Sequence, residues 1–167
     1  MKLITRLFSG LIVVLLFTSC SANLPAETPA ASPDDQLARQ ALADFINALH
    51  SGQYEEAARL YGGSYEIHIS QNPQIDPQDH AALFQNTCSN NGFMCLQILT
   101  IEKDSSVSNT EFTFLVQFQN ANGSQFIQGP CCGESETDSP PISDFPFRVV
   151  KDPSGKMLVL DMVPYIP

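Results

Sequence analysis

The chain has 167 residues, of which 43% are apolar and 16% are charged. This length suits a single domain with one hydrophobic core. The 18 acidic and 8 basic residues give a net charge of −10. Such a balance repels nucleic-acid phosphates and anionic lipid headgroups, so we expect no nucleic-acid partner and no purely electrostatic membrane binding.

The first residues have the pattern of a secretory signal. Lys2 and Arg6 precede an apolar stretch of about a dozen residues, which is too short to span a bilayer because that takes roughly 20. The run LFTSC at residues 16–20 follows, and it resembles a bacterial lipobox, although Phe17 departs from the usual aliphatic residue. In a lipobox, cleavage occurs before a cysteine that carries a diacylglyceryl group.

This resemblance implies a lipoprotein signal peptide over residues 1–19 and lipidation of Cys20. Acyl chains such as palmitate would then anchor the protein to the membrane, on the extracytoplasmic side of the bacterial cell envelope. Ordinary signal cleavage near Ala22 or Ala26 is the alternative. Residues 20–33 are rich in proline and contain little to bury, which predicts a disordered tether.

The sequence then predicts helices. Ser32, Pro33 and an acidic first turn indicate a helix start, and Gly52 indicates its end. Apolar residues recur at helical spacing in this segment, at Leu37, Ala38, Ala41, Leu42, Phe45, Ile46 and Leu49. A second helix is predicted over residues 53–60, and a short strand over residues 64–70.

A third helix is predicted after an Asp-Pro start signal at residues 76–79, with its buried side between His80 and Cys88 and its end at Asn90-Asn91-Gly92. Alternating apolar residues then predict strands, most clearly over residues 112–118. Asn122-Gly123 predicts a hairpin into a strand that ends near Cys131, and a last hairpin pairs residues 145–150 with residues 157–163. Helices followed by a strand meander indicate an α+β fold.

The passage ALADFINALHSGQYEEAARLY at residues 41–61, with this element order, resembles the nuclear transport factor 2-like (NTF2-like) family. The resemblance implies one domain over residues 34–167, with N-terminal helices in the concave face of a curved antiparallel sheet that forms a cone. Enzymes of this fold carry an acid, base or tyrosine inside the cone. Candidate cavity residues are Tyr61, Tyr65, His68, Phe84, Phe112 and Phe114.

Four cysteines besides Cys20 predict disulfides in an exported domain, with three connectivities open. If Gln119 faces Ser124 across the hairpin, Cys131 lies opposite Phe112, far from Cys95 along the sheet. A disulfide needs Cα atoms within about 7 Å. We therefore favour a Cys88–Cys95 bridge and a bridge between Cys131 and Cys132. The spacing of these four cysteines along the sequence does not suit a zinc site.

No spaced catalytic motif is found, and no cofactor or metal is expected. His50 suits a helix C-terminus, and His80 lies in a first helical turn. His68, on a strand with Glu66 beside it, would either line the cone or face water. Other polar candidates are Tyr54, Asp144 and Asp161, with Asp161 expected on the solvent face. The acidic loop at residues 133–144, which carries Glu134, Glu136 and Asp138, is a candidate partner-binding loop rather than a calcium site.

These observations predict a membrane-anchored lipoprotein with a non-catalytic domain that binds an envelope protein or a small apolar ligand. An enzyme that uses the cone cavity, of isomerase or hydrolase type, and a structural subunit of a membrane complex are the alternatives.

Overall fold

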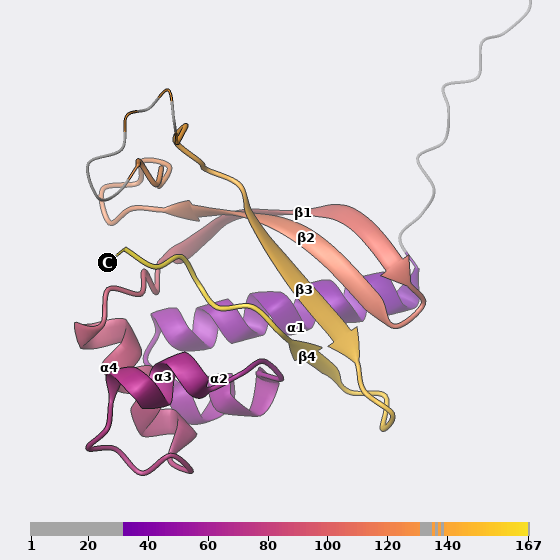
Figure 1. The fold of residues 1–167 in the computed structure, drawn as a ribbon. Coiled ribbons are helices and arrows are strands. Elements are labelled where there is room, and N and C mark those ends of the chain that lie inside the picture. Colours follow the sequence, from indigo (N-terminus) through magenta and orange to yellow (C-terminus); the bar gives the residue numbers. More distant parts are fainter. Residues whose placement is uncertain (1–31, 131–134, 136, 138, 167) are drawn as a thin grey trace, which may run out of the picture. The chain divides into compact units, whose positions relative to one another are not determined.

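The computed structural model describes residues 32–130, 135, 137 and 139–166. In these residues four helices precede four strands, which confirms the predicted α+β order. The helices are α1 (Pro33–His50), α2 (Tyr54–Leu60), α3 (Glu66–Gln71) and α4 (His80–Asn90). The strands are β1 (Gln97–Ser108), β2 (Glu111–Gln119), β3 (Phe145–Lys151) and β4 (Met157–Val159). They form one antiparallel sheet in the order β1-β2-β3-β4, and α1 lies along one face of its curve (Figure 1).

Helix α1 begins at the predicted residue because its cap is complete. The Ser32 hydroxyl accepts a hydrogen bond from the Asp35 amide at 3.1 Å, and the Asp35 carboxylate accepts one from the Ser32 amide at 2.9 Å. This reciprocal capping box satisfies two amides that the helix cannot pair internally. The predicted stripe is buried except for Leu37, which is 56% exposed, so its assignment to the core was wrong.

The core lies between α1 and the sheet. Burial alternates along strand β2, as predicted. Its buried side chains pack against α1 and lie beside the buried aromatic and aliphatic residues of β3. The residues that make this sheet face are Phe112, Phe114, Val116, Phe118, Phe145, Phe147 and Val149. Period-two alternation places them all on one side of the sheet.

Helix α4 starts and ends where the sequence predicts. The Asp79 carboxylate caps it by accepting a hydrogen bond from the Ala82 amide at 3.0 Å. The helix continues to Asn90, and Gly92, with φ of +74°, follows its end. Cys88, near that end, forms a disulfide with Cys95, with Cα atoms 5.5 Å apart, as predicted.

The strand predicted over residues 64–70 is wrong. Residues Glu66–Gln71 form helix α3, whose first turn is closed by the Ile69 amide, 2.9 Å from the Tyr65 carbonyl oxygen. The alternation that suggested a strand covers too few residues to distinguish the two periods. The assignment of faces therefore changes: His68 is fully buried, whereas Ile67 is exposed.

The strand predicted after the Asn122-Gly123 turn is also wrong. The turn itself exists, with Gly123 at φ +85°, but the described residues after it form two isolated bridges, Gln119–Gln125 and Gln128–Ile142, and no strand before β3. Strand β2 pairs with β1 along one edge and, over Glu111–Val116, with β3 along the other, so only the end of β2 is left for the segment after the turn. Phe112 lies opposite Val149 on β3. Cys131 and Cys132 lie outside the described residues.

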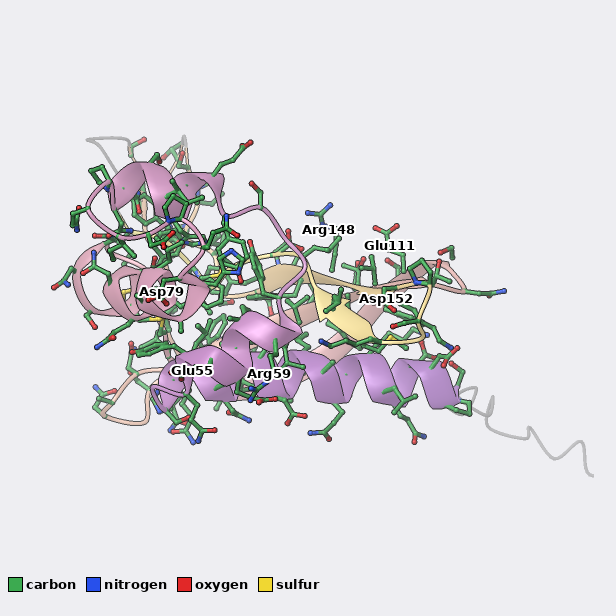
Figure 2. All side chains as sticks on the ribbon, turned by 90° about the horizontal axis from the view of Figure 1, so that it is seen from below. Glu55, Arg59, Asp79, Glu111, Arg148 and Asp152 are labelled. Carbon is green, nitrogen blue, oxygen red and sulfur yellow. A yellow bond between two sulfur atoms is a disulfide. The ribbon has the colours of Figure 1, made fainter. Side chains whose placement is uncertain are left out.

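The last hairpin is shorter than predicted, because β4 ends at Val159. Beyond it, Asp161 accepts hydrogen bonds from the backbone and the guanidinium of Arg148, at 2.7 to 3.0 Å. Figure 2 shows Arg148 and Glu111 on the side of the sheet that faces away from α1. Asp161 is thus on the partly exposed side, where the sequence predicts it, and it is held there by an ion pair.

Candidate functional site

The predicted cavity residues lie in the interior, and they fill it. Tyr61, Tyr65, His68 and Phe84 are mutual neighbours, with ring centroids 5.1 to 6.4 Å apart. They bring together α3, α4 and the end of α2. Phe112 and Phe114 are buried on β2, in the sheet side of the core. The spacing of the rings is that of packed aromatic side chains.

His68 is the centre of this aromatic cluster. Its Nδ1 lies 3.1 Å from the Thr87 hydroxyl, and its Nε2 is buried without a hydrogen-bond partner among the described residues. Burial lowers the pKa of His68 to about 4. The imidazole is therefore neutral near pH 7, because the charged form would lose its hydration without gaining a counter-ion.

The two tyrosines beside it are also held in their neutral forms. The Tyr61 hydroxyl donates to the Ser64 carbonyl oxygen at 3.2 Å, and burial, with Asp161 nearby, raises the pKa of Tyr61 to about 12. Burial likewise raises the pKa of Tyr65, whose ring stacks on His80 at 3.8 Å. Raised tyrosine pKa values do not favour these hydroxyls as bases or nucleophiles near neutral pH.

The remaining polar candidates are dispersed. Tyr54 packs at the edge of the core, and Asp144 accepts a hydrogen bond from Gln117 at 2.7 Å. His50, in the last turn of α1 as predicted, lies 3.0 Å through Nδ1 from the Cys95 carbonyl oxygen. The structure brings none of these three next to His68. Glu134, Glu136 and Asp138 of the acidic loop lie outside the described residues.

The open space on the molecule is elsewhere. A groove of about 830 Å³ runs between α1 and β1, and it is lined by Arg39, Ala43 and Asn47 on the helix and by residues 97–103 on the strand. A smaller hollow of about 490 Å³ lies where α3, α4 and the C-terminal segment meet. Neither is lined by the aromatic cluster. Among the described residues, the hollows therefore open on the surface and not into the predicted cone interior.

The α1–β1 groove follows an edge of the sheet. β1 is the first strand in the sheet order, so its outer edge has no strand beside it in the described part of the chain. The Arg39 guanidinium donates to the Ile101 carbonyl oxygen, which shows that this carbonyl points away from β2. Leu99, in the same stretch, is 41% exposed. The groove thus offers backbone groups and one large apolar side chain.

Charged side chains close one end of the groove. Lys103 on β1 forms an ion pair of 2.7 Å with Asp35 on α1, and this contact holds the pKa of Asp35 below its ordinary value. Irregularities in the β1–β2 register at Ile98–Thr100 and at Lys103–Ser105 bend the strand. Bulges and charges of this kind restrict edge-to-edge pairing to a short stretch. The stretch without an ion pair is residues 97–101, which includes the irregularity at Ile98–Thr100 and the Ile101 carbonyl oxygen that accepts from Arg39.

Sequence reasoning missed this groove. The period-two pattern after Cys95 predicts strands, but nothing in it indicates which strand lies at the sheet edge. An arginine on α1, at Arg39, just outside the buried stripe, was the only local signal, and it is typical of any exposed helix face.

Within residues 32–166, as far as they are described, no three histidine, cysteine or acidic side chains are grouped to hold a metal ion. In the same residues, no helix has the length and apolar character needed to cross a bilayer. No protein-family model matches the chain, and no curated protein is found to be similar to it.

Proposed function

We propose that this chain is a lipid-anchored lipoprotein of the bacterial cell envelope, with a non-catalytic, NTF2-like binding domain. The signal-like N-terminus and the residues before Cys20 support the anchor. The helices that lie along a curved antiparallel sheet support a cone of the NTF2-like type (Figure 1). The domain would be displayed outside the cytoplasm, where the Cys88–Cys95 disulfide is stable.

The observation that carries the binding function is the groove beside the unpaired edge of β1. A segment of another protein in extended conformation would add to residues 97–101 as a further strand, with its backbone bonded to that of β1. Leu99 would contact an apolar side chain of this segment. Binding of this kind needs no catalytic group and no cofactor.

The charges indicate what the segment carries. Arg39 and Glu102 both line the groove, and neither forms an ion pair with a described residue. Lys103, by contrast, is already paired with Asp35. An acidic side chain in the bound segment would pair with Arg39 and give the site both register and partner choice. The occupant that we propose is therefore an extended segment of an envelope protein that places one acidic side chain beside Arg39.

The enzyme alternative has less support. An enzyme of isomerase or hydrolase type would need space beside a polar group inside the cone, whereas His68, Tyr61 and Tyr65 are packed against Phe84. A small apolar ligand in the interior would have to displace these rings. Groove binding at β1 requires no such rearrangement.

The test is site-specific photocrosslinking in the intact bacterial cell. A photoreactive amino acid at Leu99 should give a defined adduct in the membrane fraction, whereas the same group at the exposed Glu55 on α2 should not. Arg39→Ala should remove the Leu99 adduct, and Arg59→Ala, a matched change on α2, should leave it. Peptide mapping of the adduct should find a segment with an acidic residue at the crosslinked site. Cys20→Ala should move the protein out of the membrane fraction.

Three outcomes would contradict the proposal. Equal adducts from Leu99 and Glu55 would mean random collision, and an adduct with twice the mass of the chain would mean self-association through β1. A Cys20→Ala variant that stays in the membrane fraction would contradict the lipid anchor.

A further inference from the structure

A second hollow, of about 490 Å³, has a different chemistry from the groove. It is formed by the ends of α3 and α4 and by the C-terminal segment, and we call it the amide pocket. The residues that line it are Gln71, Asn90, Asn91, Gly92, Tyr165 and Ile166. Its volume falls in the range of about 300 to 1,000 Å³ that is typical of small-molecule sites.

The wall of the amide pocket is polar but carries no charge. Three of its side chains are carboxamides, each with donors and an acceptor on one planar group. None of the acidic residues that the structure describes lines this hollow. The pocket therefore suits a neutral ligand with hydroxyl or amide groups, and it offers nothing to neutralise a phosphate or a carboxylate.

Hydrogen bonds hold two of the three carboxamides, Asn90 and Asn91, in place. Buried Asn72 donates to the His68 carbonyl oxygen at 2.6 Å, and its own oxygen accepts a hydrogen bond from Asn91 at 3.1 Å. Asn86 also donates to Asn72, and Asn90 to Asn86. This network fixes the side chains before a ligand arrives, which lowers the entropy cost of binding.

One acceptor of the pocket has no partner. The Gln71 side-chain oxygen is buried and accepts no hydrogen bond from a described residue. A buried polar atom of this kind costs free energy unless something donates to it. This oxygen has almost no accessible surface, so a hydroxyl group of a ligand would donate to it once the Gln71 side chain turns toward the hollow.

The pocket also has an aromatic wall. Tyr165 is 37% exposed, and its ring centroid lies 4.9 Å from that of Phe93, which supports it from the core side. Gln128 donates to the Tyr165 carbonyl oxygen at 3.0 Å, and the Ile166 amide donates to that of Gly92 at 2.9 Å. The C-terminal segment is thus fixed beside α4.

We infer that the amide pocket binds a neutral saccharide. A pyranose ring presents hydroxyl groups that both donate and accept, which matches carboxamides, and an apolar C–H face that packs on an aromatic ring such as Tyr165. The net negative charge of the chain disfavours anionic sugars. This site is independent of the β1 groove, since the two share no residue.

The test is saturation-transfer difference NMR on the full chain in detergent, with chitotetraose as the neutral probe. Saturation should reach the ring protons of the sugar, and Tyr165→Ala should weaken binding by about tenfold or more. Asn91→Asp, which keeps the shape and adds a charge, should also weaken it. Gln40→Ala, which removes an exposed carboxamide on α1, should leave it unchanged. Unfolding curves of each variant control for loss of structure.

Any of the following results would contradict the binding of a neutral saccharide in the amide pocket. Transfer that is equal in Tyr165→Ala and the parent chain would mean that the sugar binds elsewhere. The absence of transfer to chitotetraose, and to cellotetraose as a second neutral probe, would mean that the pocket does not take neutral sugars. Stronger transfer to tetraglycine would assign the carboxamides to a peptide backbone, and stronger transfer to oligogalacturonate would contradict the charge argument.

Discussion

His68 is buried in its neutral form because five side chains close around it. Its neighbours are the rings of Tyr61, Tyr65, Phe84 and Phe93, and its one hydrogen bond goes to Thr87. No acidic side chain pairs with it among the described residues, so nothing stabilises an imidazolium there. Protonation of His68 therefore lowers the free energy of unfolding of the chain.

The sign follows from the two pKa values. His68 titrates near 6.5 when the chain is unfolded and near 4 when it is folded, so the unfolded state binds more protons between these values. The stability from neutral His68 is complete above about pH 6.5 and is lost as the pH falls toward 4. Between about pH 7 and about pH 4.5 the loss is about 2 kcal/mol.

His68→Gln removes this dependence, because an amide does not titrate. Urea unfolding at the two pH values should show a pH effect about 2 kcal/mol smaller than in the parent chain, even if the variant is less stable at both. His50→Gln, at an exposed histidine, controls for loss of an imidazole in general. An unchanged pH effect in His68→Gln would contradict a neutral buried His68.

Gly92 is required by the close approach of the C-terminal segment to α4. Its φ is +74°, and a Cβ at this position would lie 2.1 Å from the carbonyl oxygen of Ile166. Both facts disfavour a residue with a side chain. The positive φ would cost such a residue about 1 kcal/mol, and its Cβ would force the two backbone segments apart. The amide pocket thus depends on a glycine that contributes no side chain.

Gly92→Ala should destabilise the chain by more than Gly155→Ala. Gly155 also has positive φ, +91°, but a Cβ there meets nothing within 4 Å, so it carries only the conformational cost. Thermal or urea unfolding should separate the two variants, by about 1 kcal/mol or more. Equal losses would mean that the contact with Ile166 does not constrain the fold. Gly92→Ala should also weaken chitotetraose binding, whereas Gly155→Ala should not.

Among the helices and strands, the sequence correctly predicts those whose own residues carry a strong local signal. Helix α1 has a capping box, a proline and a long apolar stripe, and β2 has nine residues of clean alternation. Each signal is repeated over enough residues to separate a period of 3.6 from a period of 2. Helix α3, with six residues, is too short for that separation.

The other wrong predictions concern how one helix or strand pairs or packs with another. The turn at Asn122-Gly123 is real, yet the segment after it meets only the end of β2, because the rest of that edge is paired with β3, which is more than twenty residues further along the chain. Competition for a sheet edge is decided by the packing of the whole core, which local pattern does not contain. For the same reason the α1–β1 groove and the amide pocket, which join distant segments, could not be predicted.

At the scale of the molecule, the two surface sites lie on different parts of one scaffold. The groove belongs to α1 and the sheet, and the amide pocket belongs to the shorter helices and the C-terminal segment. The Cys88–Cys95 disulfide joins these parts, because it ties the end of α4 to the segment that enters β1. The bridge closes a short loop that includes Gly92 and Phe93, next to the pocket.

Removing this disulfide should therefore affect the whole fold. With a sequence separation of 7, the bridge closes a loop for which chain entropy alone gives a stabilisation of about 2.5 kcal/mol. Cys88→Ala with Cys95→Ala should lower the free energy of urea unfolding by about 2 to 3 kcal/mol. Reduction of the parent chain by dithiothreitol should lower it by a similar amount, because both treatments release the same loop.

Cys131→Ala with Cys132→Ala is the matched control. A bridge between adjacent residues closes almost no loop, so its loss should leave the free energy of unfolding nearly unchanged. Intact mass before and after reduction should show a gain of two hydrogens for each bridge, and peptide mapping should find Cys88 joined to Cys95. A Cys88 peptide joined to Cys131 or Cys132 would contradict the pairing. Equal destabilisation by the two double substitutions would show that the adjacent cysteines also constrain the fold over a longer range.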